Sequence, residues 1–201
     1  MPLQNRVTPF GAILALPERG TLMGNRGGRI HDADKRLSGR PWTSRRWIAC
    51  ELVYKDWWRP VMGKGYTELF FMDEVTALAA GHRPCYFCRR AEAKAFAAAF
   101  AKGQGGGLLD ADAMDVILHA ERLDGRAKRT HRREARDLPD GAVYAAADQA
   151  FALRDGQRLR WAASGWQPAG PRRGGSVEVL TPPSILAALR AGYQPRWHRG
   201  S

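Results

Sequence analysis

Alternating hydrophobic and polar positions mark two strand candidates in the first half of the chain. In "RRWIACELVYK", residues 45–55, the side chains of Ile48, Cys50 and Leu52 fall on one side, and this period of two is typical of a β-strand. The apolar stretch "GYTELFFM", residues 65–72, predicts a second strand, and "DWWRPVMGKG" between them has the composition of a turn. We therefore expect the two strands to form a β-hairpin.

Helical spacing follows in three segments. Asp73 suits the N-cap of a helix in "DEVTALAAG", and Gly81 suits its end. Phe96 and Phe100 are four residues apart in "CYFCRRAEAKAFAAAFAKG", which places both rings on one helical face. The third segment, "DADAMDVILHAERL", repeats apolar residues with the same period. We expect three helices between residues 73 and 123.

The pattern changes after Leu138. Short apolar runs alternate with Asp-Gly turns, which predicts a small antiparallel sheet. The stretch "VEVLTPPSILAALRAGYQPRWH" then predicts a strand, a Pro-Pro turn and a closing helix. The flexible stretch 103–107 divides the chain into two units, 1–103 and 108–201, of which the second combines a basic helix with a small β-rich unit. The expected fold class is α+β.

Positive charge is the main compositional feature of the chain. Among 201 residues, 32 are Lys or Arg and 20 are Asp or Glu, which gives a net charge of +12. Clustered cations displace counterions from a phosphate backbone, so the excess indicates DNA or RNA as the partner, with a merely basic surface as the alternative. The strongest run is "RAKRTHRREAR", residues 126–136, and a glycine-rich loop within residues 1–41 is also basic. The candidate phosphate contacts are Arg26, Arg29, Arg45, Arg46, Arg129, Arg132 and Arg133.

Tryptophans stand next to several of these arginines. Trp57 and Trp58 are consecutive in the expected turn, beside Arg59. Aromatic rings interleaved with guanidinium groups suit base stacking combined with phosphate contact. Core packing is the alternative, and we expect it for Trp47, whereas two adjacent tryptophans in a turn are hard to bury together. Trp57 and Trp58 are therefore candidate nucleic-acid contacts.

Cysteine spacing predicts a metal site. The stretch "GHRPCYFCRR" places Cys85 and Cys88 at the start of an expected helix, where both thiolates can reach one ion and backbone amides stabilise their charge. Cys50 on the neighbouring strand supplies a third thiolate, and zinc is the expected cofactor. Two structural thiols or a redox pair are the alternatives. We favour His31 as the fourth ligand; the other candidates are a water, His82, His119 and His131.

These residues carry a resemblance to a known family. The stretch "TELFFMDEVTALAAGHRPCYFCRR", residues 67–90, resembles the second half of the zinc domain of Ada alkylation-repair proteins, where a short helix and a glycine turn lead through Arg-Pro-Cys into a CxxC. In that family four cysteines hold the zinc, and one accepts a methyl group from a DNA phosphotriester. Cys85 and Cys88 match the second pair, and Cys50 can stand for one of the first. The positions four residues away from Cys50 are not cysteine, so the resemblance implies zinc and DNA binding rather than methyl transfer.

Two classes of enzyme are alternatives to a binding protein. Zinc-dependent nucleobase deaminases combine H-x-E with P-C-x-x-C, and this chain has "HAE" at residues 119–121 and "PCYFC" at residues 84–88, in reversed order. For His119 the alternative is a polar contact with Asp115, four residues earlier. A nuclease or glycosylase would instead use acid–base or metal-assisted chemistry from His31, Asp32, His131 and Glu134. The candidate catalytic residues are His119, Glu121, His131 and Glu134.

The sequence thus predicts an α+β protein in which zinc staples a hairpin/helix unit, followed by a helix and a small antiparallel sheet. The leading function is a zinc-containing nucleic-acid-binding protein in DNA repair or modification. The alternatives are a zinc-dependent enzyme acting on nucleic acid, as a base deaminase, nuclease or glycosylase, and a protein-interaction module. No run approaches the roughly 20 apolar residues of a membrane span, and three cysteines do not make a disulfide framework. We therefore expect a cytoplasmic protein with no membrane partner.

Overall fold

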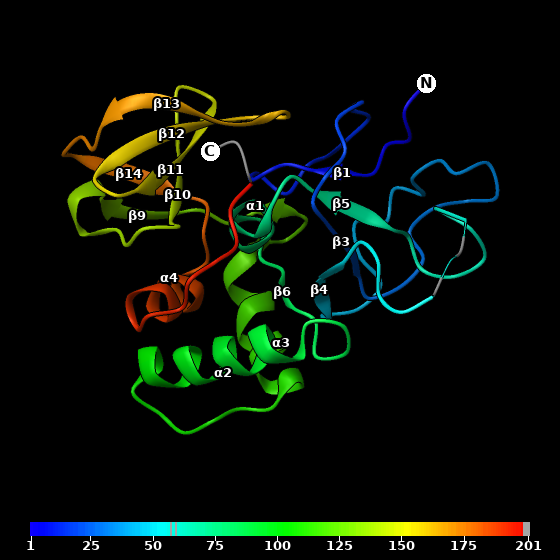
Figure 1. The fold of residues 1–201 in the computed structure, drawn as a ribbon, viewed down its shortest axis with the longest axis horizontal. Helices are drawn as coiled ribbons and strands as arrows, with labels where there is room; N and C mark the ends of the chain where they lie inside the picture. Colours follow the sequence, from blue (N-terminus) through cyan, green and yellow to red (C-terminus); the bar gives the residue numbers. More distant parts are fainter. Residues whose placement is uncertain (57, 59, 199–201) are drawn as a thin grey trace.

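Two six-stranded sheets lie side by side, and the longer helices run along one side of the pair (Figure 1). A computed structural model describes residues 1–56, 58 and 60–198 of the chain. Within this described part there are four α-helices, the two larger sheets and a two-stranded sheet. The predicted α+β class is confirmed.

The first sheet has the strand order β2-β1-β5-β3-β4-β6. β3 lies between β4 and β5 and pairs antiparallel with both. The two strands predicted within residues 45–55 and 65–72 are present, but they do not form the expected hairpin, because β3 separates them. The strands of this sheet are β1 (Arg6–Val7), β2 (Ile13–Leu14), β3 (Leu22–Arg26), β4 (Trp47–Glu51), β5 (Leu69–Phe71) and β6 (Arg83–Pro84).

Gly24 explains how β3 takes this central place. A Cβ on Gly24 would lie 2.0 Å from the backbone oxygen of Ile48 in β4 and 2.8 Å from the ring of Phe71. Only glycine therefore lets β3 pack this closely against its neighbours. The close approach depends on residues far away in the sequence, which is why the local pattern does not predict it.

Helices α2 (Arg90–Gln104), α3 (Ala111–Arg122) and α4 (Pro183–Arg190) pack against one another. Their apolar faces meet in a core that includes Phe96, Phe100, Met114, Leu118 and Ile185. The short helix α1 (Glu74–Ala79) starts after Asp73, whose carboxylate accepts a hydrogen bond from the Thr76 amide at 2.9 Å. The three helices expected from residue 73 onward and the closing helix are all present.

The second sheet is antiparallel throughout, with the order β13-β12-β11-β10-β14-β9. The Asp-Gly pattern after Leu138 predicts most of it, but the sheet also includes β9, which comes from the basic run. Its strands are β9 (His131–Glu134), β10 (Val143–Ala146), β11 (Gln149–Arg154), β12 (Gln157–Ala162), β13 (Gly165–Pro171) and β14 (Ser176–Val179), and a 3-10 turn (Ala135–Asp137) follows β9.

The basic run does not extend a helix, which corrects the expected basic helix. Helix α3 ends at Arg122, and Gly125 then turns the chain with a φ of 57°, in the left-handed region. The turn joins β7 (Leu123–Asp124) to β8 (Ala127–Lys128) in the two-stranded sheet. The positive charges of residues 126–136 therefore lie on short strands and turns.

Two hydrophobic clusters contain residues from both sides of the glycine-rich stretch at residues 103–107. Val75 of α1 and Trp166 of β13 belong to one buried cluster, and the Trp166 indole donates a hydrogen bond to Asp73 at 2.8 Å. The helical core likewise combines Leu78 with residues of α3 and α4. The two expected units, 1–103 and 108–201, thus share buried clusters.

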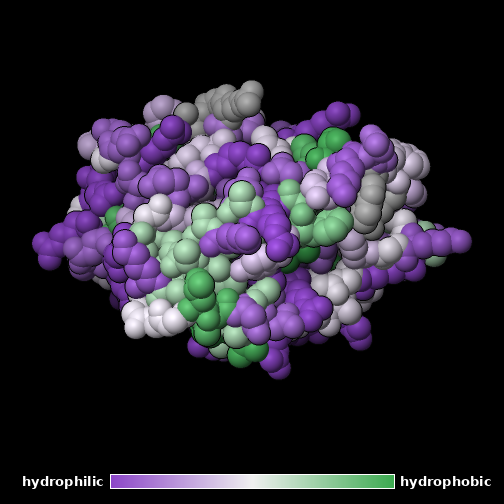
Figure 2. Space-filling view, turned by 60° about the horizontal axis from the view of Figure 1, so that its bottom comes forward, coloured by the Kyte–Doolittle hydropathy of each residue, from purple (hydrophilic) through white to green (hydrophobic). Residues whose placement is uncertain are grey.

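Seen from the helical side, polar residues cover most of the surface and apolar residues gather near its middle (Figure 2). Large apolar side chains that remain exposed include Val53, Trp58 and Phe87. In the described part of the chain, no helix is both long and apolar enough to cross a lipid bilayer.

Candidate metal centre

The parallel pairing of β4 with β6 brings two cysteines together. Ala49 is opposite Pro84 in this register, and the Cys85 amide donates to the Ala49 carbonyl at 2.9 Å. One residue further along each strand, Cys50 and Cys85 are neighbours. The chain positions these thiols through backbone pairing between segments that are about 35 residues apart in the sequence.

A tight turn after β6 adds the third thiol. The Arg89 amide donates to the Cys85 carbonyl at 3.0 Å, which closes the Cys-x-x-Cys turn immediately before α2. The sulfur atoms of Cys50, Cys85 and Cys88 all lie within 4.8 Å of one another. None of the three is in a disulfide bond. The three predicted cysteine ligands are therefore together in the structure and can bind a metal ion.

Backbone amides donate hydrogen bonds that stabilise negative charge on the cysteine sulfur atoms. The Phe87 amide donates to the sulfur of Cys85, and the Glu51 amide donates to the sulfur of Cys88, both at 3.4 Å. Hydrogen bonds from the Cys50 and Cys88 thiols lower the pKa of Cys85 far below that of an ordinary thiol. Donating to Cys85 and Cys88, together with burial, raises the pKa of Cys50. A bound cation would replace these shared protons.

A network of ion pairs holds the residue that follows the Cys-x-x-Cys turn, Arg89. Arg89 is fully buried, and its guanidinium lies 2.8 Å from Glu74 and 3.4 Å from Glu51. Arg196 reaches Glu51 at 2.7 Å, and the Tyr193 hydroxyl donates to Glu74 at 2.6 Å, so the C-terminal segment is tied to the same network. The doubled arginine after Cys88 is the signal in the sequence that points to Arg89, but its partners are distant and are not visible there.

His31 does not join the cysteines. Its Nδ1 is 2.6 Å from the Thr67 hydroxyl and its Nε2 is 3.0 Å from the Gly63 carbonyl, so both ring nitrogens have partners elsewhere. His82 is completely buried, with its ring 4.6 Å from that of Phe71. Among the described residues, no histidine, aspartate or glutamate belongs to the cysteine group. The group thus offers three ligands.

The cysteines form part of the wall of a large cavity. Its volume is about 960 Å³, and all three cysteines line it. Aromatic side chains contribute much of the remaining wall: Tyr54, Trp58, Tyr66, Phe70 and Phe87. Polar and charged residues also line it: Asn5, Asn25, Arg6, Arg19, Glu51, Asp56 and Glu68. A metal ion held by the three thiols would therefore face a space that can hold a ligand.

The candidate phosphate contacts divide into buried and exposed groups. Arg26 is only 4% exposed, which corrects its assignment as a nucleic-acid contact. Its guanidinium lies 4.1 Å from the ring centroid of Trp47 and donates to the Gly11 carbonyl at 2.7 Å. Exposed side chains are found at Arg29, Arg45, Arg46, Arg129, Arg132 and Arg133, and Arg46 forms an ion pair with Asp112 at 2.7 Å.

Trp47 is buried as expected, Trp58 is 86% exposed, and Trp57 lies outside the described residues.

Buried cationic groups gather around Trp47. The guanidinium of Arg122 also lies 4.1 Å from the Trp47 ring centroid, and the Lys128 ammonium donates to the Ala79 carbonyl at 2.6 Å. Burial lowers the pKa of Arg26 and of Arg122 to about 9. Burial, with Arg122 and Arg26 nearby, lowers the pKa of Lys128 to about 7, and the same causes lower that of His82. Arg26, Arg122 and His82 are thus buried, whereas Lys128 is half-buried.

The candidate catalytic residues are outside the cysteine group and do not line the large cavity. Glu121 accepts hydrogen bonds from the Ser184 amide at 2.9 Å and the Ser184 hydroxyl at 2.6 Å, at the start of α4. His131 Nε2 is 3.0 Å from the Glu121 carbonyl. The ring of His119 meets Trp42 edge-on at 5.5 Å, and Glu134 is opposite Ser176 in the β9–β14 pair. These positions give Glu121 a role in holding α4.

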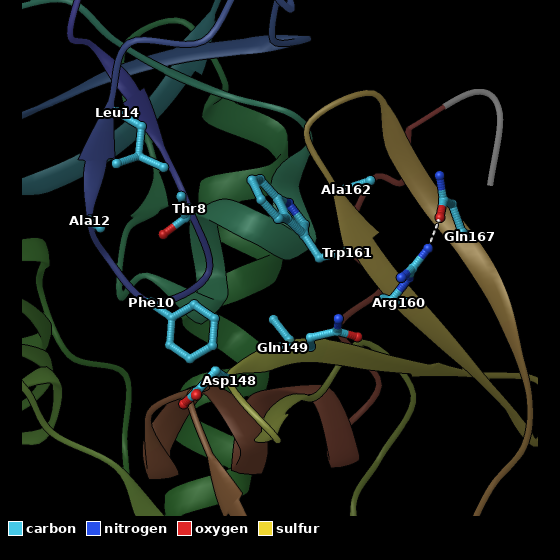
Figure 3. A pocket seen from close by; sticks show the side chains of 11 residues that line it. Thr8, Phe10, Ala12, Leu14, Asp148, Gln149, Arg160, Trp161, Ala162 and Gln167 are labelled. Atoms are coloured by element: carbon cyan, nitrogen blue, oxygen red, sulfur yellow. Dashed lines mark hydrogen bonds between the residues drawn. The ribbon is translucent and has the colours of Figure 1, made fainter.

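A second cavity of about 560 Å³ lies between the β1–β2 connection and strands β11 and β12 (Figure 3). Phe10 and Trp161 project into it from opposite sides (Figure 3). Thr8 contributes a buried hydroxyl that has no hydrogen-bond partner among the described residues, and Arg160 donates to Gln167 at 2.6 Å. No cysteine lines this cavity, so it is separate from the metal centre.

Searches of protein-family models, curated proteins and solved structures found no match to this chain.

Proposed function

We propose that this chain is a zinc-containing nucleic-acid-binding protein with a role in DNA repair or modification. The observation that carries the proposal is the group of three thiols in the wall of a cavity bordered by aromatic side chains. Three sulfur ligands select soft or borderline metals, and zinc combines thiolate affinity with a preference for tetrahedral sites. Cys50, Cys85 and Cys88 would hold the ion, and the charge of +12 favours a polyanionic partner.

Exposed arginines on several elements support the nucleic-acid part of the proposal. Arg45 and Arg46 precede β4, which carries Cys50, and Arg29 follows β3. Arg132 and Arg133 are exposed on β9, a short edge strand of the second sheet. Each exposed arginine that contacts a phosphate adds to the affinity and to its salt dependence.

The resemblance of residues 67–90 to the Ada zinc domain also supports the proposal. This stretch folds as strand β5, helix α1, a turn at Gly81 and the Cys-x-x-Cys turn, in the order on which the resemblance rests. Gly81 has a φ of 87°, a conformation that favours glycine. Only two of the family's four cysteines have counterparts by motif, so methyl transfer is not part of the proposed function.

A second candidate function is a zinc-dependent enzyme acting on nucleic acid. The specific observation in its favour is that the cysteine group supplies three ligands and faces the cavity. Catalytic zinc sites keep a coordination position for water or substrate, where the metal lowers the pKa of the bound water. Among the described residues, the carboxylates that line the cavity are Glu51, Asp56 and Glu68, and these would carry protons in place of Glu121 and Glu134.

Metal analysis combined with binding measurements tests the proposal. Purified protein should contain about one zinc per chain, and Cys85→Ser should lose it. Zinc-loaded protein should bind single-stranded or duplex DNA or RNA with an affinity that falls steeply with salt, and the triple variant Arg129→Gln, Arg132→Gln, Arg133→Gln should flatten that dependence. A metal-free wild type, or binding that does not change with salt, would contradict the proposal.

Product analysis separates the two candidate functions. Oligonucleotides incubated with zinc-loaded protein are examined by mass spectrometry. Unchanged oligonucleotides support a binding protein. A one-dalton gain or strand scission that disappears in Glu68→Gln or Glu51→Gln, but persists in Glu121→Gln, would establish the enzyme.

A further inference from the structure

We infer that the cavity beside the three cysteines receives a single unstacked nucleobase from a bound DNA or RNA strand. This inference rests on the proposed nucleic-acid function and names the part of the ligand that the cavity recognises. It follows from the aromatic rings at the cavity, the buried amides in its wall, and its size and charge.

Exposed aromatic rings border the cavity. Trp58 is 86% exposed and Phe87 is 55% exposed, although both are large and apolar. The Tyr54 ring lies 5.1 Å from that of Phe87, with the two planes steeply inclined. Leu52, which also lines the cavity, is exposed as well. Exposed apolar groups concentrated at one cavity indicate a binding surface, and flat rings accept any base by stacking.

Buried amides supply polar recognition deeper in the wall. Asn5 is 1% exposed, and its Nδ2 donor has no hydrogen-bond partner in the described structure, whereas its Oδ1 accepts from Arg6. Asn25, 6% exposed, uses its side-chain oxygen to accept from the Gly27 amide. An unsatisfied amide donor in a buried position is costly, and an acceptor on a ligand would satisfy it. The edge of a nucleobase carries ring nitrogen and carbonyl acceptors of this kind.

The size of the cavity fits a base together with its sugar-phosphate, and its wall contains Arg6 and Arg19 together with the carboxylates of Glu51, Asp56 and Glu68. The cavity of about 960 Å³ is at the upper end of the roughly 300–1,000 Å³ that small-ligand sites occupy. Arg19 is exposed at the cavity, and Arg6, also in the wall, lies 5.0 Å over the Phe70 ring. These cations would meet a phosphate while the base enters. A base that is stacked inside a duplex cannot enter, so the ligand is an unpaired or extruded base.

Three DNA duplexes that share one sequence test the inference. One is fully paired, one carries a single unpaired base, and one carries an abasic residue at that position; binding is followed by fluorescence anisotropy at fixed salt. The wild type should bind the duplex with the unpaired base at least tenfold more tightly than the abasic duplex. With 2-aminopurine as the unpaired base, its emission should fall on binding, because stacking on an aromatic ring quenches it.

Two sets of variants locate the site. The double variant Trp58→Ala, Phe87→Ala should remove the preference for the unpaired base and the quenching, while salt-dependent binding to the paired duplex remains. Both side chains are exposed, so their truncation should leave folding intact, which circular dichroism checks. Val116→Ala removes an exposed apolar side chain on α3, and Phe10→Ala alters the second cavity; both should behave as wild type.

The outcomes distinguish this inference from the proposed function. If all three duplexes bind equally and with the same salt dependence, the protein binds nucleic acid but the base site is refuted. If the preference survives in the double variant, or is lost in Phe10→Ala instead, the base does not enter the cavity beside the cysteines. If no duplex or single strand binds at any salt concentration, the proposed function fails and the base site fails with it.

Discussion

Strand β4 contributes to two clusters of like groups, one around Cys50 and one around Trp47, three residues earlier. Around Cys50, three thiols share protons, and two of them, Cys85 and Cys88, receive hydrogen bonds from backbone amides. Around Trp47, Arg26, Arg122 and the neighbouring Lys128 concentrate positive charge. The first cluster is arranged to hold negative charge and the second to hold positive charge, yet in neither does an oppositely charged side chain within the described residues neutralise all of it.

The clusters differ in what compensates their charge. The cations meet a π face and carbonyl oxygens: Arg122 donates to the Gly81 carbonyl at 2.8 Å and to the Arg45 carbonyl at 2.6 Å, and Lys128 donates to Ala79. Ala79 and Gly81 are at the C-terminal end of α1, where backbone dipoles favour cations. Among the described residues, the contacts of the sulfur atoms are with backbone amides and with one another. The chain itself thus compensates the cation cluster, whereas the thiol cluster can bind a metal ion that compensates its charge.

Removing the metal ion should have the largest effect on the stability of the fold. The effect should arise at the thiol cluster. If a zinc ion compensates three thiolates, chelation should destabilise the fold by several kcal/mol and lower the melting temperature by about 10 °C. Calorimetry with and without a chelator measures this shift. Cys85→Ser should show the lower melting temperature from the start and no further loss with chelator. If the melting temperature of the wild type does not change when the chelator is added, the thiols need no ion.

Removing the π face should break the cation cluster. Trp47→Leu loses the ring on which Arg26 and Arg122 lie and leaves both cations buried, so we expect a loss of about 3–5 kcal/mol in the free energy of unfolding. Urea denaturation at neutral pH measures it. Trp47→Phe keeps an aromatic face and should lose less. Equal losses in the two variants would mean that packing volume, and not the π face, holds the cations.

Raising the pH should stabilise the fold, because it removes the proton from Lys128 in the cation cluster. The pKa of Lys128 is lowered to about 7 from 10.5, so between these values the unfolded chain binds a proton that the folded chain does not. Stability should therefore rise with pH across this window and fall as the pH drops through it. Arg26, Arg122 and His82 face the same space, and the two arginines oppose protonation of Lys128.

Replacing Lys128 isolates its part of this dependence. In Lys128→Met the free energy of unfolding should change with pH by about 1–2 kcal/mol less than in the wild type across the window, because the side chain is only partly shielded from water. Denaturation curves at several pH values measure the difference. Lys94→Met, on the exposed face of α2, is the matched control and should keep the wild-type slope. An unchanged slope in Lys128→Met would exclude Lys128 as its source.

The sequence predicts local features and misses the long-range contacts that form the two clusters. The Cys-x-x-Cys spacing and the cap at Asp73 are local, and the structure has both. Arg26 and Arg29 have the same glycine-rich surroundings in the sequence, yet Arg26 is buried against Trp47 and Arg29 is exposed. What separates them is the pairing of β3 with β4, which places Arg26 opposite Trp47. Charge patterns along the chain do not carry that information, so the sequence alone predicts Arg26 as a surface contact.

The smallest effect on the thiol cluster should come from His31→Ala. The sequence favours this histidine as a fourth ligand because it lies in a polar loop, but its two ring nitrogens contact Thr67 and Gly63. Its loss should cost about 1 kcal/mol of stability from these hydrogen bonds and leave the zinc content unchanged. Metal analysis after dialysis against a weak chelator, with Cys88→Ser as the positive control for zinc loss, measures this directly. Zinc loss in His31→Ala that matches the loss in Cys88→Ser would mean that the loop rearranges to close the site, and the metal would then have no position left for a ligand in the cavity.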